Sequence, residues 1–314
     1  MKGKLIILVG ISNSGKSTFA SKLVQSNPEK FIRVNRDAIR NLLYGYNNET
    51  ISSYYERNDI RTLEKQITRF EDTLIYDGLE LGKTVIVDAT HLTKSYIERF
   101  KYWNVETELA FFPIELHEAF DRNSRRTRKV PNEVMKKQFN QFSTLTKLLE
   151  KEPIDFTPIE LDLERKTRPS VVVFDIDGTL AEKGNRSAYD WANVGEDSEI
   201  HGVCAISRHL NKSFKQVEDK HGKYLAPKII IATGRDGVCI DETEKWLLKN
   251  HISYDEIYIR PKGDMRPDWI IKQEMAQEIL KSYNILGWFD DRLQVTRHLR
   301  MLGLEVYNVA HGNF

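Results

Sequence analysis

The sequence contains short, continuous apolar runs separated by longer stretches with helical spacing. These runs are Leu5–Val9, Thr84–Val87, Val171–Phe174, Ile229–Ala232, Ile257–Ile259 and Ile285–Phe289. Continuous apolar runs of this length are typical of strands that are covered on both faces, as in parallel sheets. We therefore predict an α/β fold with a parallel sheet in each half of the chain.

Between the predicted strands, apolar residues recur at intervals of three and four. One such series is formed by Ile60, Leu63, Ile67, Phe70 and Leu74. This spacing places the side chains on one face of an α-helix, which we expect to be buried. A similar spacing over residues 135–149 predicts another helix near the end of the first half.

The character of the chain changes between residues 151 and 169, where Pro153, Pro158 and Pro169 stand among charged residues. Proline is unfavourable in helix interiors and in central strands, so this segment is predicted to be a connection. We predict two tandem domains, residues 1–152 and 170–314, joined by a linker of residues 153–169. A chain of 314 residues is long enough for two domains of ordinary size.

Composition excludes several classes of protein. With 47 basic and 46 acidic residues, the chain has no overall basic field, so any contact with a polyanion must be local. Two cysteines, Cys204 and Cys239, form neither a disulfide framework nor a CxxC zinc site, which fits a reducing compartment. Apolar runs fall short of the ~20 residues of a membrane helix, and the first run is interpreted as a strand rather than a signal peptide. We expect a cytoplasmic protein without membrane contact.

Residues 10–17, Gly-Ile-Ser-Asn-Ser-Gly-Lys-Ser, match the pattern GxxxxGK[ST] between a predicted strand and a predicted helix. Glycines let backbone N–H groups surround a phosphate, the lysine supplies charge to the β- and γ-phosphates, and the final serine ligates Mg²⁺. The pattern predicts ATP and Mg²⁺ as cofactors. The expected contacts are Gly10, Ser14, Gly15, Lys16, Ser17 and Thr18.

Other charged residues of the first half have two interpretations each. Asp37 is either a general base for a hydroxyl acceptor or the N-terminal cap of the helix that carries Arg40, a residue suited to an anionic group of the acceptor. Asp88, at a strand end, either lies near Mg²⁺ or caps the next helix. Five basic residues within 122–129 suit a phosphate-binding lid, a nucleic-acid contact or a solvated helix face.

The second half carries Asp-Ile-Asp-Gly-Thr at residues 175–179, directly after a predicted strand. Alternation along an extended chain places Asp175 and Asp177 on the same side. Open α/β sheets bind their ligands at this edge. Such a pair of carboxylates can hold Mg²⁺, with one acting as nucleophile and the other as acid and base.

This segment resembles the first motif of the haloacid dehalogenase superfamily, which forms an aspartyl-phosphate. The resemblance implies that Asp175 attacks phosphorus, that Asp177 protonates the leaving oxygen, and that Thr179 lies at the substrate. Later segments are similar to the second, third and fourth motifs of the superfamily. These are Thr233-Gly234-Arg235, in which Thr233 would bond the phosphoryl group, Lys272, and Asp290-Asp291, which would complete the Mg²⁺ site with Asp175 and Asp177.

The intervals between these motifs constrain the substrate. Only 56 residues separate Asp177 from Thr233, and 37 separate Arg235 from Lys272. The superfamily places large cap domains over small substrates in these two intervals, and neither has room for one here. We therefore expect an open site that suits a bulky substrate, such as the end of a polynucleotide.

The order of the two sites resembles the phage family of polynucleotide 5′-kinase/3′-phosphatases over almost the whole chain. The resemblance is carried by Asn35-Arg36-Asp37 with Arg40, Arg122-Asn123-Ser124 with Arg126, residues 175–190 with Arg186, Arg235, Asp268, and residues 290–295. It implies that Asp37 deprotonates the 5′-hydroxyl and that Arg40 holds the 3′-phosphate of the terminal nucleotide. It also implies that Arg126 reaches from a lid onto the donor phosphates.

In the phosphatase half, the same resemblance implies that Arg186, Arg235 and Asp268 help to bind phosphate and organise the site. Three departures from the family pattern stand in the first half. Asn13 occupies a position that is usually glycine, the lid segment before Pro131 is one residue shorter, and Asp88 lies one position early.

The predicted activity is therefore bifunctional healing of RNA or DNA ends, with transfer of the ATP γ-phosphate to a 5′-hydroxyl. A 3′-phosphate, or a 2′,3′-cyclic phosphate, would be removed so that a partner ligase can join the ends. The resemblance also implies a homotetramer. Two alternatives are the same chemistry on a small phosphorylated metabolite and a non-catalytic adaptor that binds nucleic acid. The short intervals argue against the first, and the complete sets of catalytic residue types argue against the second.

Overall fold

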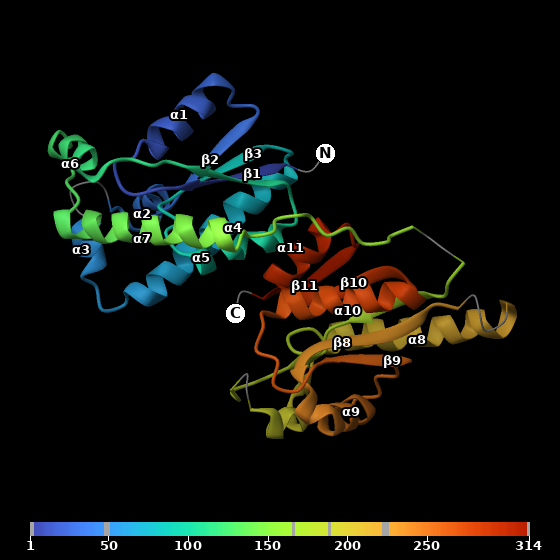
Figure 1. The fold of residues 1–314 in the computed structure, drawn as a ribbon. Helices are drawn as coiled ribbons and strands as arrows, with labels where there is room; N and C mark the ends of the chain where they lie inside the picture. Colours follow the sequence, from blue (N-terminus) through green and yellow to red (C-terminus); the bar gives the residue numbers. More distant parts are fainter. Residues whose placement is uncertain (1–2, 47–50, 165–166, 188–189, 222–225, 313–314) are drawn as a thin grey trace. The chain divides into compact units, whose positions relative to one another are not determined.

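A computed structural model describes residues 3–46, 51–164, 167–187, 190–221 and 226–312. The chain divides into two compact units, Met1–Pro158 and Ile159–Phe314, each with its own parallel sheet (Figure 1). The predicted α/β class with two tandem parallel sheets is confirmed. The boundary between the units lies in the proline-containing segment 153–169, and the domain bounds 1–152 and 170–314 stay a prediction.

The sheet of the first unit has the strand order β2-β3-β1-β4, and every pairing is parallel. Its strands are β1 (Lys4–Val9), β2 (Phe31–Asn35), β3 (Thr84–Asp88) and β4 (Thr107–Phe111). The helices are α1 (Lys16–Ser26), α2 (Arg36–Tyr44), α3 (Ile51–Tyr55), α4 (Ile60–Glu80), α5 (Lys94–Glu98), the 3₁₀ helix η1 (Arg99–Trp103), α6 (Leu116–Ser124) and α7 (Asn132–Lys151). Because β1 lies inside the sheet, the loop that follows it lies between the ends of β3 and β4.

The sheet of the second unit has the order β11-β10-β5-β8-β9, again entirely parallel. Its strands are β5 (Ser170–Phe174), β8 (Lys228–Asp236), β9 (Glu256–Arg260), β10 (Asn284–Arg292) and β11 (Val306–Gly312). The helices are η2 (Trp191–Glu196), α8 (His201–His221), η3 (Gly237–Cys239), α9 (Ile240–Lys249), α10 (Asp268–Ser282) and α11 (Leu293–Met301). A separate antiparallel pair is formed by β6 (Ala181–Glu182) and β7 (Ser198–Glu199).

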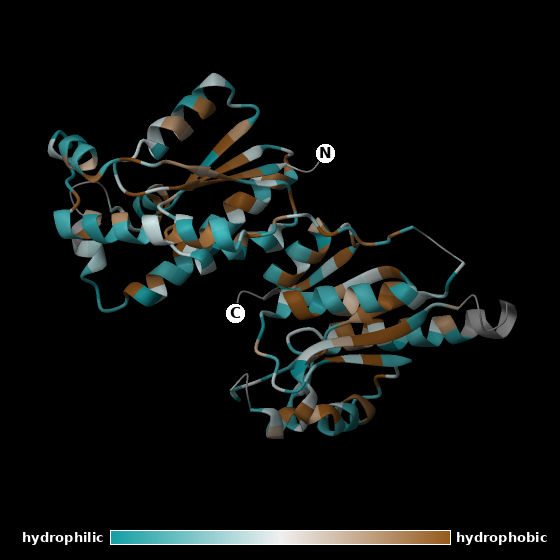
Figure 2. Cartoon of the chain, viewed as in Figure 1, coloured by the Kyte–Doolittle hydropathy of each residue, from teal (hydrophilic) through white to brown (hydrophobic). Residues whose placement is uncertain are grey.

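Apolar residues of the second sheet pack on both of its faces, because parallel strands carry alternating side chains to two layers of helices. On one face, Val171 and Val173 pack with residues of α10 and α11. On the other, Val172 and Phe174 pack with residues of α8 and α9. Figure 2 shows the apolar positions concentrated on the strands of both sheets. This burial explains the continuous apolar runs in the sequence.

The predicted apolar face of α4 is partly wrong. The buried face of the helix runs through Leu63, Ile67, Glu71, Ile75 and Leu79. Phe70 and Leu74, which the spacing assigned to this face, are 43% and 36% exposed. The side chain of Glu71 is fully buried because it pairs with Arg36 and Arg99. An ion pair therefore takes a position that apolar periodicity alone assigns to a hydrophobic residue.

Within the described residues, the structure has no helix with the length and hydropathy needed to cross a membrane. Cys204 and Cys239 are both buried, and both are free thiols. This agrees with the prediction that the two cysteines form no disulfide framework.

Candidate active sites

Residues 10–17 form the turn between β1 and α1 in the first sheet. Asn13 and Gly15 have left-handed backbone conformations, with φ values of +67° and +98°. Gly10 is required for a different reason, because a Cβ atom there would lie 2.9 Å from the carbonyl oxygen of Phe112. The loop is therefore fixed by backbone geometry at three positions, as a tight phosphate-binding turn requires.

Lys16, the first residue of α1, is buried inside this turn. Its Nζ donates to the carbonyl oxygen of Ile11 at 2.6 Å and to Oγ of Ser14 at 3.3 Å. Burial lowers the pKa of Lys16 to about 8, although the charge of Asp88 acts in the opposite direction. The ammonium group is thus positioned at the loop, while the neighbouring Ser17 and Thr18 are exposed.

Asn13 links the loop to the segment between α6 and α7. Its Oδ1 accepts a hydrogen bond from Nη1 of Arg126 at 2.6 Å, and its backbone oxygen accepts one from Arg122 at 3.2 Å. Its Nδ2 donates to Oδ1 of Asn123 at 3.2 Å and to Sδ of Met135 at 3.3 Å. The sequence marks Asn13 only as a departure from a usual glycine, whereas the structure shows that it ties the basic segment to the phosphate loop.

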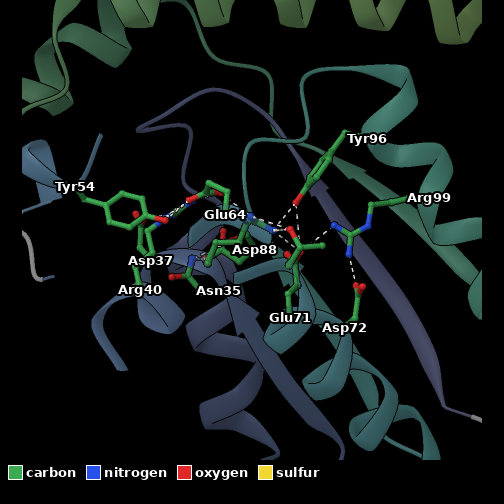
Figure 3. A network of polar contacts seen from close by, with 12 residues as sticks. Asn35, Asp37, Arg40, Tyr54, Glu64, Glu71, Asp72, Asp88, Tyr96 and Arg99 are labelled. Carbon is green, nitrogen blue, oxygen red and sulfur yellow. Dashed lines mark hydrogen bonds and ion pairs between the residues drawn. The ribbon is translucent and has the colours of Figure 1, made fainter. Parts of the chain in front are cut away.

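Asp37 lies in the first turn of α2, but it is not the N-terminal cap of that helix. The cap is Asn35, whose side chain accepts a hydrogen bond from the backbone N–H of Ala38 at 2.9 Å. The half-exposed Asp37 carboxylate instead accepts from Arg40 at 2.7 Å (Figure 3). It also accepts from Arg128 at 3.1 Å. The capping interpretation of Asp37 is therefore wrong, and its carboxylate is bound by two arginines.

Arg40 is buried and makes several contacts with Glu64 of α4. Its Nε and Nη2 reach the Glu64 carboxylate at 2.9 to 3.0 Å, while Tyr54 donates to the same carboxylate at 2.6 Å and Arg36 at 2.7 Å (Figure 3). Partial burial by itself would raise the pKa of Glu64, but these hydrogen bonds lower it.

Sequence reasoning did not single out Glu64 or Glu71. The available signal was their seven-residue separation, which puts two acidic side chains on one face of the predicted helix, two turns apart. Arg36 joins them, because it reaches Glu64 at 2.7 Å and Glu71 at 2.6 Å. The two glutamates thereby organise the arginines of the first site.

Asp88 is buried at the end of β3, where the sequence places it. Its carboxylate accepts from Nε and Nη2 of Arg33 at 2.9 and 2.5 Å, and from Asn35 at 3.3 Å. Arg33, on β2, was not singled out by sequence reasoning. These contacts make Asp88 an ion-pair partner beside Lys16, on whose ammonium group its charge acts.

In the second unit, three carboxylates meet at the ends of two neighbouring strands. Asp175 directly follows β5, and Asp290 and Asp291 lie in β10, which pairs with it. One oxygen atom of each lies within 4.8 Å of the others. Burial and mutual repulsion raise the pKa of Asp175 and of Asp291 to about 7, and that of Asp290 to about 6. A bound cation would therefore favour the ionised form of the cluster.

The residues of this cluster fit Mg²⁺. Oδ2 of Asp291 is buried without a hydrogen-bond partner, while Oδ1 accepts from Thr179 at 3.4 Å. Gly178 has a φ of +84°, and a Cβ atom there would lie 2.2 Å from Oδ2 of Asp291. Three converging carboxylates with an unpartnered oxygen are the donor set that hard divalent cations prefer.

Lys272, on α10, supplies one positive charge to the cluster. Its fully buried Nζ donates to Asp175 at 2.6 Å, to Asp290 at 3.4 Å and to the carbonyl oxygen of Ala232. Burial by itself would lower the pKa of Lys272, but the two carboxylates raise it above its ordinary value. The third-motif candidate thus contacts the predicted nucleophile directly.

The Asp177 carboxylate contacts two arginines. It accepts from Arg235 at 2.8 Å and from Arg186 at 3.1 Å. Both arginines also bind the buried Asp197, Arg186 at 2.6 Å and Arg235 at 2.7 Å. Asp197 lies in a stretch with no motif and could not be singled out from sequence, yet it contacts both arginines that bind Asp177.

The second-motif segment forms one wall of the site. Thr233 is fully buried, and its Oγ1 accepts from the backbone N–H of Arg235 at 3.2 Å. Gly234 has no room for a side chain, because its Cβ would lie 2.2 Å from Oδ1 of Asp268. Asp268 in turn binds Arg260 at 2.9 Å and Arg292 at 3.1 Å. Thr233, Gly234 and Asp268 therefore lie together, as the sequence predicts.

A groove of about 690 Å³ along α7 lies apart from these groups. It is lined by residues 92–94 and by the face of α7 that includes Lys136, Asn140 and Leu145. Its lining contains none of the predicted site residues. Cavity volume alone therefore does not locate the two phosphate sites, which are defined by charge and backbone geometry.

Two family models match the chain, one for each unit. Residues 5–149 match an AAA domain, and residues 169–314 match the phosphatase domain of polynucleotide kinase PNKP. The first unit is thus similar to an AAA domain, and the second is similar to the phosphatase domain of polynucleotide kinase PNKP.

Two curated proteins and a solved structure are also similar to this chain. A viral protein from Autographa californica nuclear polyhedrosis virus, provisionally named a bifunctional polynucleotide kinase/RNA ligase, is 27% identical over 98% of this chain and 42% of its own length. An L-seryl-tRNA(Sec) kinase of Methanococcus maripaludis is 30% identical over 45% of this chain and 52% of its own. The chain thus spans about half the length of these curated relatives. A chain in the Pnkp1/Rnl/Hen1 RNA repair complex is 28% identical, with full coverage of this chain, 97% coverage of that chain and a TM-score of 0.43.

The contacts of Asn13 predict that it holds the basic segment closed. Asn13→Gly keeps the left-handed backbone but removes the side-chain hydrogen bonds. Opening of the basic segment should therefore cost about 1 kcal/mol less, which raises the open population roughly fivefold. Limited trypsin digestion within residues 122–129 measures this opening. Asn13→Ala should be less stable than Asn13→Gly in thermal unfolding, because alanine is strained at this φ. Equal digestion of wild type and Asn13→Gly would contradict the tether.

The raised pKa values of the acidic cluster predict a pH-dependent response to Mg²⁺. These carboxylates bind more protons in the folded than in the unfolded chain between about pH 4 and 7, so stability without metal falls as pH rises through that range. Mg²⁺ should therefore raise the melting temperature more at pH 8 than at pH 5.5. Calorimetry without nucleotide tests this.

Asp291→Asn is the matched variant for the Mg²⁺ measurement, because it removes the charge beside the unpartnered oxygen and keeps the shape. Its Mg²⁺ response at pH 8 should be much smaller than that of wild type. An exposed change, Asp241→Asn on α9, should leave the response intact. A response that is independent of pH, or retained in Asp291→Asn, would place the metal elsewhere.

Proposed function

We propose that this chain heals the ends of RNA or DNA: it phosphorylates 5′-hydroxyl ends with ATP and removes 3′-phosphates, including 2′,3′-cyclic phosphates. The observation that carries the proposal is the presence, in one chain, of a lysine-containing phosphate loop with the Asp37–Arg40 pair and a separate acidic cluster with Asp177. The names of the viral relative and of the matching phosphatase family support the same reading.

In the kinase half, Lys16 and the loop N–H groups would hold the donor phosphates, and Ser17 would hold Mg²⁺. Asp37 would accept the proton of the 5′-hydroxyl, while Arg40 would bind the adjoining 3′-phosphate. Arg126 would move from Asn13 onto the donor phosphates. Lys16, Asp37, Arg40 and Arg126 are already positioned by an ion pair or hydrogen bond within the unit.

In the phosphatase half, Asp175 would attack phosphorus and form an aspartyl-phosphate, while Asp177 protonates the leaving oxygen. Asp175, Asp290 and Asp291 would hold Mg²⁺, which neutralises charge on the phosphate oxygens when it is bound. Lys272 keeps the Asp175 carboxylate ionised and oriented through its 2.6 Å contact. We assign the metal contact to these three carboxylates rather than to the Asp177 side chain, which is held by two arginines.

The small size of the elements between Asp177 and Thr233 supports a polynucleotide substrate. Among the described residues between Asp177 and Thr233, the only strands besides β8 are the short pair β6 and β7, accompanied by η2 and α8. These elements do not amount to a domain-sized cap that would enclose a small substrate. We propose the division into a kinase domain of residues 1–152, a linker of 153–169 and a phosphatase domain of 170–314. A partner ligase, a homotetramer and a cytoplasmic location stay predictions.

One oligonucleotide with a 5′-hydroxyl and a 3′-phosphate tests both activities. With ATP and Mg²⁺, Lys16→Ala should lose 5′ phosphorylation by roughly 100-fold or more while it keeps 3′ dephosphorylation. Asp175→Asn should lose dephosphorylation by at least about 1,000-fold and keep the kinase. Mass spectrometry follows each end separately.

Two exposed substitutions serve as controls for this experiment, Lys22→Ala on α1 and Asp241→Asn on α9. Both should retain both activities. If wild type leaves both ends unchanged but hydrolyses a generic phosphate ester, the polynucleotide proposal fails and a small phosphorylated metabolite becomes the better substrate.

The position of Asp197 predicts a role in catalysis that does not depend on contact with substrate. Asp197→Asn should lower the turnover number of the 3′-phosphatase by roughly 10- to 100-fold, with a smaller effect on KM, because both arginines of Asp177 lose their shared anchor. The adjacent exposed Glu196→Ala is the matched control, and 5′-kinase activity reports on folding. Unchanged turnover in Asp197→Asn would show that the arginines are held without it.

A further inference from the structure

A half-exposed aromatic ring lies beside the residues that would bind the acceptor. Tyr55, the last residue of α3, has 52% of its surface exposed. The guanidinium carbon of Arg40 lies 5.5 Å from the centroid of its ring. Tyr54 meets the same ring edge to face, with centroids 5.3 Å apart and an interplanar angle of 85°. The ring is thus fixed by a cation and by a second ring, while about half of the residue faces solvent.

The support beneath Tyr55 is rigid. Tyr54 is fully buried, packs edge to face against Tyr46 at 5.0 Å and donates to Glu64 at 2.6 Å. Glu64 also holds Arg40 through two nitrogen atoms. One carboxylate therefore fixes both groups that contact Tyr55. An exposed ring that is held in this way loses little conformational freedom when a ligand covers it.

The charges around the ring belong to the acceptor site. Burial raises the pKa of Tyr55, the charge of Arg40 opposes that rise, and Asp37 and Arg128 act on the same hydroxyl. Asp37 is the predicted base, and Arg128 comes from the basic segment and binds it at 3.1 Å. The Tyr55 ring therefore lies next to the place where the 5′-hydroxyl and the adjoining phosphate would be held.

We propose that Tyr55 is the stacking platform for the terminal nucleobase of the acceptor strand. This proposal rests on the proposed 5′-kinase activity and adds a specificity-determining residue to it. Stacking on an aromatic ring is tolerant of sequence, because every base has a flat π-face. Arg40 would bind the phosphate of the same nucleotide whose base covers Tyr55. Two adjacent side chains would thus hold both ends of one nucleotide and leave its 5′-hydroxyl at Asp37.

The experiment combines a change in the enzyme with the matching change in the substrate. The acceptors are an oligonucleotide with an ordinary 5′-terminal nucleotide and one whose terminal nucleotide is abasic. Tyr55→Leu removes the aromatic face but keeps an apolar contact with Tyr54. It should raise KM for the ordinary acceptor by about 5- to 100-fold, with KM for ATP unchanged. With the abasic acceptor, wild type and Tyr55→Leu should have nearly the same KM.

Two variants complete the series. Tyr55→Phe keeps the ring and should stay within about twofold of wild type, which separates stacking from hydrogen bonding by the hydroxyl. The matched control is Tyr307→Ala, which removes another partly exposed ring on β11 of the second unit. It should leave KM for the acceptor unchanged. Thermal unfolding and KM for ATP show whether each variant is folded.

The outcomes separate the stacking proposal from the proposed function. Tyr55→Leu and the abasic nucleotide each change KM for the acceptor. If the two fold-changes in KM simply multiply when they are combined, the ring does not contact the base and the stacking proposal is overturned. It is also overturned if Tyr55→Phe is as impaired as Tyr55→Leu. If wild type phosphorylates no 5′-hydroxyl end, the proposed function itself fails, and the stacking proposal fails with it.

Discussion

A buried carboxylate stays ionised only when a positive group lies against it, and both units of this chain are organised by that constraint. In the second unit, Asp175, Asp290 and Asp291 converge where two paired strands end, and the single charge of Lys272 does not balance three. The excess negative charge, together with the unpartnered oxygen of Asp291, makes the cluster a candidate cation site. The three carboxylates meet because adjacent parallel strands end at the same edge of the sheet.

The first unit satisfies the same constraint without a metal. Glu64 and Glu71 lie two turns apart on α4, and Arg36 spans them. Each glutamate then takes a further arginine, Arg40 at Glu64 and Arg99 at Glu71. Removing one partner of such a buried pair costs far more than the pair contributes, so these contacts hold the arginines in fixed places. The position of Arg40 is therefore set by the helix that packs behind it.

Sequence patterns predicted the features that depend on residues close together in the chain. The six predicted apolar runs coincide with β1, β3, β5, β8, β9 and β10, whereas β2, β4 and β11 were not predicted. The phosphate loop and the Asp175–Asp177 segment follow from residue types at fixed spacing. Contacts between segments far apart in sequence were not predictable. Asp197 joins Arg186 and Arg235 across 11 and 38 residues, and Asn13 meets Arg126 across 113. The face of α4 was misjudged for the same reason, because the arginines that bury Glu71 come from other elements.

The two sites differ in how they meet a substrate. In the phosphatase half, a bound cation would stabilise the acidic cluster, so the cluster would be ordered before the substrate binds. In the proposed kinase half, the Asp37 carboxylate is already paired, since Arg40 contacts one of its oxygens and Arg128 the other. An arriving phosphate would take the place of Asp37 on Arg40, and that exchange would free the carboxylate to accept a proton. Because one ion pair replaces another, the net gain in binding free energy is small. Exposure of the base would then depend on a phosphate beside the hydroxyl, which would favour polynucleotide ends over simple alcohols.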